Sequence, residues 1–354
     1  MSDAADIEVI GLAQREAWNQ RVMPPVEELR PDLWSIPVPI PNNPLRYTTV
    51  YCLATDSGVV LIDAGWQSDE VWQALSDGLA LAGATIADVK GVLVTHQHYD
   101  HIGLAKRIVE ASDAWVALHP ADTAHIMSPE FRQRELSDRL YSGWLVSLGA
   151  SEEEAWRLRP GGPDPELDPR KNFVEPDVAV EDGERLDIPG WSLRAVHTPG
   201  HTAGHLCFYD EKTDLMFAGD HVLPRISPNV SATPYPDFDA LGEFLASQDK
   251  IAAYDSADVL PAHEWRFRGL KARAEQLKTH HQHRLDELLE IVRRMPGSVP
   301  WEMAGHMTWS RSWDQYDGFM RLSAVGETTA HLVLLVNRGL VKGTDEVVPK
   351  YFLA

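Results

Sequence analysis

The sequence is poor in several features that would each define a class of protein. It has two cysteines in 354 residues, Cys52 and Cys207, and both stand in apolar, strand-like stretches. We therefore expect buried free thiols in a reducing compartment, and neither a disulfide nor a cysteine metal site. No apolar run approaches the roughly 18 residues of a membrane-spanning helix. The acidic start lacks a signal-peptide core, so we expect a cytoplasmic protein with no membrane partner.

Basic residues are also scarce. The chain has 32 Lys and Arg against 53 Asp and Glu, a net charge of −21. From Lys271 onward the two kinds nearly balance, so the negative charge lies almost entirely in the first 270 residues. Most of that surface would repel a polyanion. We expect a small-molecule substrate and no nucleic-acid partner, although a local basic patch would still allow one.

Strand-like and helix-like segments alternate through the first part of the chain. Residues 33–40 ("LWSIPVPI") and 58–65 ("GVVLIDAG") read as strands, and 69–83 ("DEVWQALSDGLALAG") has helical spacing. A buried strand "GVLV", a helix "LAKRIVEAS" and a strand "AWVALHP" follow. This alternation predicts an α/β fold, with a sheet covered by helices.

Changes in character along the chain suggest its domains. We expect an N-terminal helical extension over residues 1–30, a main α/β domain over 31–265, and a C-terminal module over 266–354. Within the main domain, residues 121–175 look helical and then rich in Pro and Gly, which is typical of a lid or substrate wall. The C-terminal module combines a long amphipathic helix with a small β-wing and reads as winged-helix-like. Its apolar stripe must be buried, against the main domain or in a homodimer.

The segment "VTHQHYDHIG" concentrates side chains that can bind metals. His96 and His98 alternate, so one loop can direct both at one point, whereas Asp100 and His101 can reach a second point nearby. Such a loop could serve two metals about 3.5–4 Å apart. Taken alone, it could equally be a solvated polar loop.

Three later segments strengthen the metal interpretation. "HTPGHTAGH" contains His197, His201 and His205, "MFAGDHV" contains Asp220, and "VLPAHEW" contains His263. Each candidate follows a strand, and strand ends are where sites collect in layered α/β folds.

These motifs together resemble the metallo-β-lactamase-fold hydrolase superfamily. "THQHYDH", "DAG", "PGHTAGH", "GD" and "AH" occur in the family's order between about residues 30 and 265. The resemblance implies a four-layer αβ/βα sandwich with a dinuclear metal site. It also implies ligands for each metal: His96, His98 and His201 for the first, Asp100, His101 and His263 for the second, and Asp220 as the bridge. Five imidazoles and two carboxylates suit two zinc ions, and iron or manganese is possible.

The remaining histidines are expected to support the fold or the site. Next to the ligand, His197 and His205 should pack or orient it, and Asp63 should orient the histidine loop as its family counterpart does. His119 is expected to be structural, and His221 either lines the cleft or is structural. We expect the helix-borne His280, His281 and His283 to be solvated or at a domain contact.

The resemblance implies hydrolysis by a metal-bridging hydroxide, with Asp100 as a possible proton acceptor. No "GxSxG" motif suggests a serine nucleophile. Asp220 stands where true β-lactamases usually have cysteine or serine, so the match is to glyoxalase II-like thioesterases, lactonases and phosphodiesterases. We expect hydrolysis of an ester, thioester or lactone of a small molecule. The alternatives are a phosphodiesterase or endoribonuclease, and a non-hydrolytic dioxygenase or binding protein.

Three residues outside the ligand set are candidates for substrate binding. Arg225 and Asn229 follow the bridging aspartate, and Arg225 could clamp a carboxylate or phosphate. Tyr141 in the helical insertion could form an apolar wall. The alternatives are a surface arginine and a helix-packing aromatic.

Overall fold

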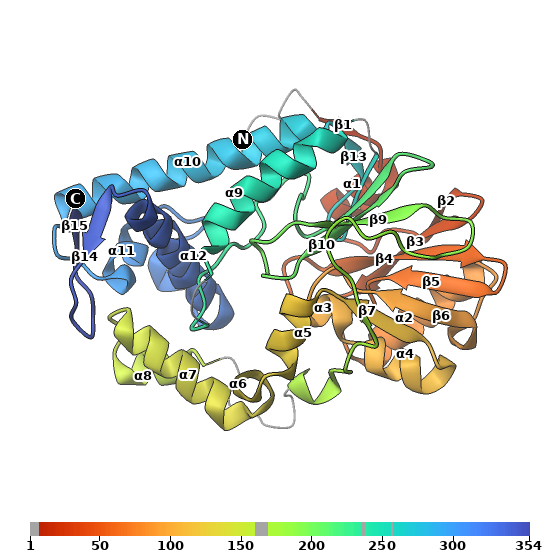
Figure 1. Cartoon of the computed structure of the whole chain (residues 1–354), viewed down its shortest axis with the longest axis horizontal. Helices are drawn as coiled ribbons and strands as arrows, with labels where there is room; N and C mark the ends of the chain where they lie inside the picture. Colours follow the sequence, from red (N-terminus) through yellow and green to blue (C-terminus); the bar gives the residue numbers. More distant parts are fainter. Residues whose placement is uncertain (1–6, 160–168, 236–237, 256–257) are drawn as a thin grey trace. The chain divides into compact units, whose positions relative to one another are not determined.

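The computed structural model describes residues 7–159, 169–235, 238–255 and 258–354. It divides the chain into two compact units, each built from separate stretches of sequence (Figure 1). The first comprises residues 1–127, 169–228 and 247–275, and the second comprises 128–168, 229–246 and 276–354.

The first unit is built on two mixed β-sheets. The seven-stranded sheet has the order β2-β3-β4-β5-β6-β7-β8, and the six-stranded sheet has the order β1-β13-β12-β11-β10-β9. The strands of the larger sheet are β2 (Glu27–Arg30), β3 (Leu33–Pro39), β4 (Tyr47–Thr55), β5 (Gly58–Ile62), β6 (Val89–Leu93), β7 (Trp115–Leu118) and β8 (Val178–Ala179). Those of the smaller sheet are β1 (Glu8–Val9), β9 (Leu193–His197), β10 (Leu206–Asp210), β11 (Leu215–Gly219), β12 (Asp258–Pro261) and β13 (Phe267–Arg268).

The core of this unit lies between the two sheets. Tyr51 and Leu53 of β4 pack in one buried cluster with Phe208 of β10 and Phe217 of β11. Tyr51 and Phe217 meet edge to face, with ring centroids 5.3 Å apart. Alternate residues of a strand point to opposite faces, so the neighbouring buried Cys52 belongs to the other side of its sheet. The two inward faces together account for the apolar strands in the sequence.

Helices cover the outer face of the larger sheet, where Figure 1 shows α2 (Asp69–Leu81) and α4 (Ala105–Ser112) beneath the strands. Gly78 of α2 lies so close to Ile36 that an added Cβ would come within 2.3 Å of it. Beside the smaller sheet, Ser247 and Gln248 of α9 (Ala240–Ile251) bond to Pro199 and His221. The layered α/β sandwich expected from the sequence is confirmed.

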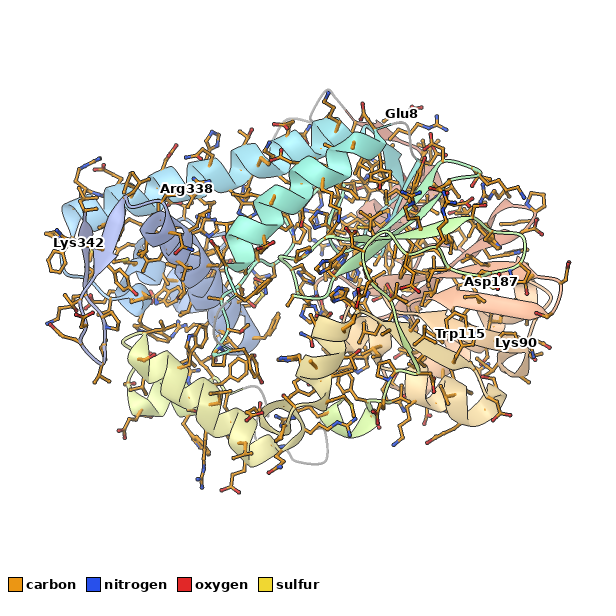
Figure 2. The ribbon with its side chains drawn as sticks, viewed as in Figure 1. Glu8, Lys90, Trp115, Asp187, Arg338 and Lys342 are labelled. Carbon is orange, nitrogen blue, oxygen red and sulfur yellow. The ribbon has the colours of Figure 1, made fainter. Side chains whose placement is uncertain are left out.

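The N-terminal segment differs from the expected helical extension. It does contain a helix, α1 (Leu12–Gln20), but β1 and β2 on either side of it are edge strands of the two sheets. Glu8 of β1, labelled in Figure 2, forms an ion pair with Arg268 of β13 across their strand pairing. The short strands satisfy backbone groups at the sheet edges, so residues 7–30 belong to the first unit.

The second unit joins the helical insertion to the C-terminal region. Its helices are α6 (Pro129–Arg132), α7 (Arg134–Ser147), α8 (Glu152–Arg157), most of α10 (Leu270–Arg294), α11 (Pro300–His306) and α12 (Gly318–Asn337). Leu145 and Ala155 of the insertion pack in one buried cluster with Ala304 of α11 and Val325 of α12. The insertion is therefore part of a helical core, and β14 (Val341–Gly343) and β15 (Tyr351–Leu353) form a two-stranded sheet in the same unit.

The expected domain limits shift accordingly. Of the proposed insertion 121–175, α5 (Pro120–Met127) and the residues from 169 onward belong to the first unit, and 160–168 lie outside the described residues. The expected C-terminal module 266–354 begins too early, because Phe267 pairs with Val9 and Val259 in the smaller sheet. The second unit takes over at Gln276, within α10. The winged-helix assignment stays a prediction.

Two helices of the second unit are strongly apolar on their buried sides. Along α10, Leu277, Leu285, Leu288 and Val292 are buried and Leu289 is partly so, as the predicted stripe requires. By length and composition α12 could cross a membrane, but 56% of that window is buried within the structure, as in the core helix of a soluble protein. His281 corrects the expectation for the α10 histidines, because it is buried and bonds to His331.

Candidate metal centre

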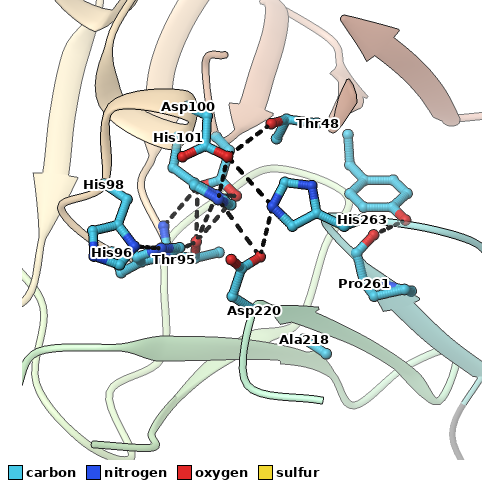
Figure 3. Close-up of polar contacts among 12 residues, drawn as sticks. Thr48, Thr95, His96, His98, Asp100, His101, Ala218, Asp220, Pro261 and His263 are labelled. Carbon is cyan, nitrogen blue, oxygen red and sulfur yellow. Dashed lines mark hydrogen bonds and ion pairs between the residues drawn. The ribbon is translucent and has the colours of Figure 1, made fainter. Parts of the chain in front are cut away.

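All seven predicted ligands lie at one edge of the two sheets, in the segments that follow strands. Figure 3 labels all of them except His201. β6 leads into the segment with His96 and His98, and the short helix α3 (Tyr99–Ile102) carries Asp100 and His101. His201 lies in the loop after β9, Asp220 follows β11 and His263 follows β12. β11 and β12 are adjacent parallel strands, so their carboxyl ends bring Asp220 and His263 together.

Three imidazoles form a first group. The Nε2 atom of His96 lies 3.0 Å from His98 Nδ1 and 3.2 Å from His201 Nε2. The three rings thus converge on one point through ring nitrogens, in the combination expected from the sequence. His96 is fully buried, whereas His98 and His201 are only partly so.

A second group contains two imidazoles and a carboxylate. His263 Nε2 lies 3.4 Å from Asp100 Oδ2, and His101 Nε2 lies 3.6 Å from the same oxygen. Both histidines are fully buried. This is the second expected combination of ligands.

Asp220 lies between the two groups, as Figure 3 shows. Its Oδ1 is 3.1 Å from His263 Nε2 and 3.5 Å from His101 Nε2. Its Oδ2 is 3.5 Å from His201 Nε2. One carboxylate therefore presents one oxygen to each group, which is the geometry that a bridging ligand needs.

The far nitrogens of the rings are held by neighbouring groups. His101 Nδ1 lies 2.8 Å from Asp63 Oδ2, and His263 Nδ1 lies 2.8 Å from the carbonyl of Tyr47. Asp63 also accepts hydrogen bonds from the backbone and hydroxyl of Thr95, and its φ of 63° turns the chain sharply after β5. With Nδ1–H donated in this way, each ring directs the lone pair of Nε2 at the centre. Asp63 thus has the orienting position expected for it.

The residues present fit two divalent cations. His101 Nε2, His263 Nε2 and Asp220 Oδ1 are buried and make no hydrogen bond among the described residues. Buried polar atoms are rarely left without a partner. A divalent cation can take up nitrogen lone pairs that face one another around ionised carboxylates, and imidazole and carboxylate suit zinc, manganese or iron.

Electrostatics prepares the first group for metal binding. Burial, together with the charge of His201, lowers the pKa of His98 to about 3. The pKa of His96 falls well below its ordinary value through burial and through His101 and His98. Both rings are therefore neutral at physiological pH, and only a neutral imidazole can bind a metal.

In the second group, nearby charges outweigh burial in setting the pKa values. Burial opposes ionisation of Asp220, but His263 and His101 hold the pKa of its carboxyl well below the usual range. Burial disfavours charge on His263 as well, but Asp220 and Asp100 raise the pKa of that ring to about 10. Without a metal, protons on these histidines compensate the buried carboxylates.

His197 and His205 take supporting positions, as expected. His205 Nε2 accepts from the backbone N–H of Asp220 at 3.1 Å, and its Nδ1 lies 2.9 Å from Thr198 Oγ1. His197 stacks on His119, with ring centroids 4.0 Å apart. His221 is fully buried beside Gln248 and therefore has a structural position.

Sequence reasoning missed Asp122, the residue that joins the two ligand loops. Its buried carboxylate accepts from Gln97 N at 3.0 Å, from Thr202 Oγ1 at 2.8 Å and from Gly204 N at 2.7 Å. Burial raises the pKa of this carboxyl to about 6, although the three donors oppose the shift. The available signal was its place just after the strand "AWVALHP", a position we assigned to the insertion.

The expected substrate-binding residues fall in different units. Arg225 belongs to the first unit with the metal centre, where its guanidinium pairs with the buried carboxylate of Glu264 at 2.6 Å. Asn229 and Tyr141 belong to the second unit. There, Asn229 accepts from Ser231, and Tyr141 lies 6.2 Å from both Trp144 and Tyr235 between ring centroids.

Comparisons with known proteins agree with this geometry. The family model of the metallo-beta-lactamase superfamily matches residues 43–263, which include every candidate ligand. A metallo-beta-lactamase family protein from Thermus thermophilus is 30% identical, with a TM-score of 0.77 over 92% of this chain and 100% of its own.

Two curated fungal proteins are also similar to the chain. The lactamase-like protein adaB of Aspergillus niger is 26% identical over 80% of this chain and 70% of its own length. The atrochrysone carboxyl ACP thioesterase of Aspergillus fumigatus is 27% identical over 72% of this chain, which spans 46% of that protein.

Proposed function

Because the chain belongs to the metallo-beta-lactamase superfamily, we propose that it is a dinuclear metal-dependent hydrolase that cleaves a thioester or another carboxylic ester, including a lactone, of a small molecule. The observation that carries this proposal is Asp220, whose two oxygens face two separate groups of ligand atoms. Two zinc ions are the cofactors that we assign to these groups.

The proposed reaction is attack by water on an acyl carbon. When bound, a pair of divalent metals lowers the pKa of water toward neutrality and polarises a carbonyl oxygen. His96, His98 and His201 would hold one ion, and His101, His263 and Asp100 the other. Asp220 would hold both.

The protein's own groups then position and exchange protons. The contacts of Asp100 with His263, His101 and Thr48 all involve its Oδ2. We assign to its Oδ1 the role of taking a proton from the attacking water and returning it to the leaving group. The hydrogen bonds of Asp63 and Tyr47 keep the rings in place, so that little reorganisation is needed during the reaction.

Thioesters are placed first among the proposed substrates because of one relative of this chain. One similar fungal protein is a thioesterase by name. An aspartate at the bridging position also fits the thioesterase and lactonase branch suggested by the sequence. The net charge of −21 gives no support to a polyanionic substrate.

The test combines metal analysis with a substrate panel. The protein is reconstituted with zinc, and elemental analysis should give close to two ions per chain. The same preparation is then assayed on thioesters, lactones, carboxylic esters, phosphodiesters and a β-lactam. Fastest hydrolysis of a thioester, ester or lactone would support the proposal. Preferential phosphodiester cleavage, or at most one bound ion at saturation, would contradict it.

A further inference from the structure

Two arginines gather around Trp18 in α1, near the metal centre. The Arg46 guanidinium carbon lies 3.8 Å from the centre of the indole ring, and that of Arg225 lies 5.2 Å from it. Arg46 also donates to the Trp18 carbonyl at 2.8 Å. Arginine favours such stacking because its planar charge attracts the aromatic face and leaves N–H groups at the edge for other partners.

Both arginines are tied to the backbone around His263. Arg46 directly precedes Tyr47, whose carbonyl holds His263 Nδ1. Arg225 pairs with Glu264, the residue directly after His263, through both its guanidinium and its backbone N–H. The Tyr47 hydroxyl donates to the Glu264 carbonyl and closes the set. The cluster therefore lies beside the second group of ligands.

Some guanidinium donors of this cluster have no partner among the described residues or face solvent. Arg46 Nη1 is buried and makes no hydrogen bond among the described residues. The side chain of Arg225 is 50% exposed, so part of its donor edge faces solvent. Burial lowers the pKa of Arg46, and the nearby charges of Arg21 and Arg225 add to the effect. In these contacts a single acidic residue, Glu264, accompanies three arginines, Arg21, Arg46 and Arg225. The cluster therefore has a local excess of positive charge, although the net charge of the chain is −21.

We propose that Arg46 and Arg225, held on Trp18, form an anion-binding subsite that takes a phosphate or carboxylate of the substrate, away from the scissile bond. This inference rests on the proposed hydrolase function and narrows its substrate class to anionic thioesters or esters. Guanidinium edges pair with both kinds of oxyanion, and charged hydrogen bonds are stronger than neutral ones. Binding energy from such a remote group can then assist the reaction at the acyl carbon.

Two pairs of substrates locate the charge. Acetyl phosphopantetheine and acetyl pantetheine differ by one phosphate on the thiol side. Glutaryl pantetheine and its neutral methyl ester differ by one carboxylate on the acyl side. For the zinc-loaded protein, kcat/KM should favour the charged member of at least one pair by about tenfold. The pair that shows the preference tells which anion the subsite takes.

Variants connect the preference to the cluster. Arg46→Gln and Arg225→Gln should each reduce the charged-to-neutral ratio severalfold, and the double variant should bring it near one. Arg30→Gln is the matched control, because Arg30 also stacks on a tryptophan, Trp191 at 5.0 Å, and pairs with an acid, Asp210 at 3.2 Å. Its acid ends β10 at the edge away from the ligand loops. Arg225 is half-exposed, so its variant remains informative if Arg46→Gln folds poorly.

A binding measurement separates this inference from the proposed function. Calorimetry compares phosphopantetheine with pantetheine, and glutarate with its neutral diamide, on the zinc-loaded protein and on the same variants. If no ester is hydrolysed but an anion-dependent gain in affinity disappears in Arg225→Gln, the subsite stands and the hydrolase proposal fails. Equal kinetics and equal binding for both members of every pair would overturn the subsite. So would a ratio that falls as much in Arg30→Gln as in Arg225→Gln.

Discussion

In the part of the chain that the structure describes, two buried groups of histidines are organised in opposite ways. In the second unit, His281 Nδ1 lies 3.1 Å from His331 Nε2, and His331 Nδ1 lies 2.7 Å from the carbonyl of Glu327. In the metal centre, by contrast, ring nitrogens face one another and two carboxylates, and two of them, His101 Nε2 and His263 Nε2, have no hydrogen-bond partner among the described residues. The helical pair is closed by its own bonds, whereas the metal centre is left open.

Charge distinguishes the two groups as well. Burial lowers the pKa of His331 to about 3 and that of His281 well below its ordinary value, with His280 and Arg284 adding to the effect. The carboxylate of Glu327 is engaged by Arg284 and does not offset it. In the metal centre, Asp220 and Asp100 outweigh burial at His263. Buried histidines thus indicate a metal when carboxylates accompany them and their inner nitrogens remain unpaired.

Removing the metals should have the largest effect, and it should affect the metal centre but not the helical histidine pair. A chelator should abolish hydrolysis, and added zinc should restore it. By linkage, bound metal at about a thousandfold above its dissociation constant adds about 4 kcal/mol, or roughly 10 °C in melting temperature for a unit of this size. Hydrogen exchange should increase at α3 and around β12 on chelation. An equal increase in hydrogen exchange at α10 and α12 would contradict the difference between the two histidine groups.

The next largest effect is expected from the substitution Asp220→Ala. Without the carboxylate that faces both groups, we expect kcat to fall by at least about 10³-fold, or about 4 kcal/mol of barrier. Metal content should fall below two ions per chain. Circular dichroism should show that the fold persists, because the two strands on either side of Asp220 do not depend on its side chain. A rate near that of the wild type would refute the bridging role.

Asp122→Asn should give a smaller loss, about 10- to 100-fold in metal affinity or activity. The carboxylate accepts from three donors, whereas an amide has one oxygen and would direct N–H groups at Gln97 N or Gly204 N. Competition with a zinc chelator measures the affinity directly. As the control, Asp88→Asn changes an acidic side chain that caps a surface turn at Thr85. Unchanged zinc affinity in Asp122→Asn would contradict the linking role of this residue.

The last prediction concerns the helical pair and pH. A histidine whose pKa is lowered in the folded state favours unfolding in acid, because below about pH 6.5 the unfolded chain takes up the proton first. At pH 5 this costs about 2 kcal/mol for each buried histidine. Hydrogen exchange in α10 and α12 should therefore be faster relative to intrinsic rates at pH 5 than at pH 7.

Substitutions sharpen this last test. Replacing both His281 and His331 by Gln should remove most of the pH dependence, although the pair's packing against Phe244 is also altered. His283→Gln changes an exposed histidine of the same helix and should leave the dependence intact. If the double variant kept the full acid sensitivity, other groups would be responsible for it.

Features that short local motifs encode could be predicted from the sequence, whereas features that depend on contacts between distant segments could not. Strand β6, the helix of residues 69–81 and the ligand set rest on short motifs with a strong local pattern, and those segments lie where expected. Asp122 was missed because its partners, Gln97 and Gly204, are distant in sequence and bond through backbone N–H groups, which carry no residue signature. The domain limits failed for a similar reason. Strands β1 and β13 have two residues each, which is too short to show periodicity. Their pairing nevertheless places both ends of the expected main domain in the first unit.

The pairing of β1 with β13 also bears on the order of events during synthesis. Residues 8–9 leave the ribosome well before their partners, residues 267–268, because Val9 and Phe267 are 258 residues apart in the sequence. At about 5–20 residues per second, the first strand waits on the order of ten seconds or more for its neighbour. His263 emerges in the same late interval, so the ligand set is complete only shortly before the sheet can close. Under the proposed function, metal would therefore be loaded late in synthesis, and a nascent chain stalled before residue 263 should hold zinc only weakly.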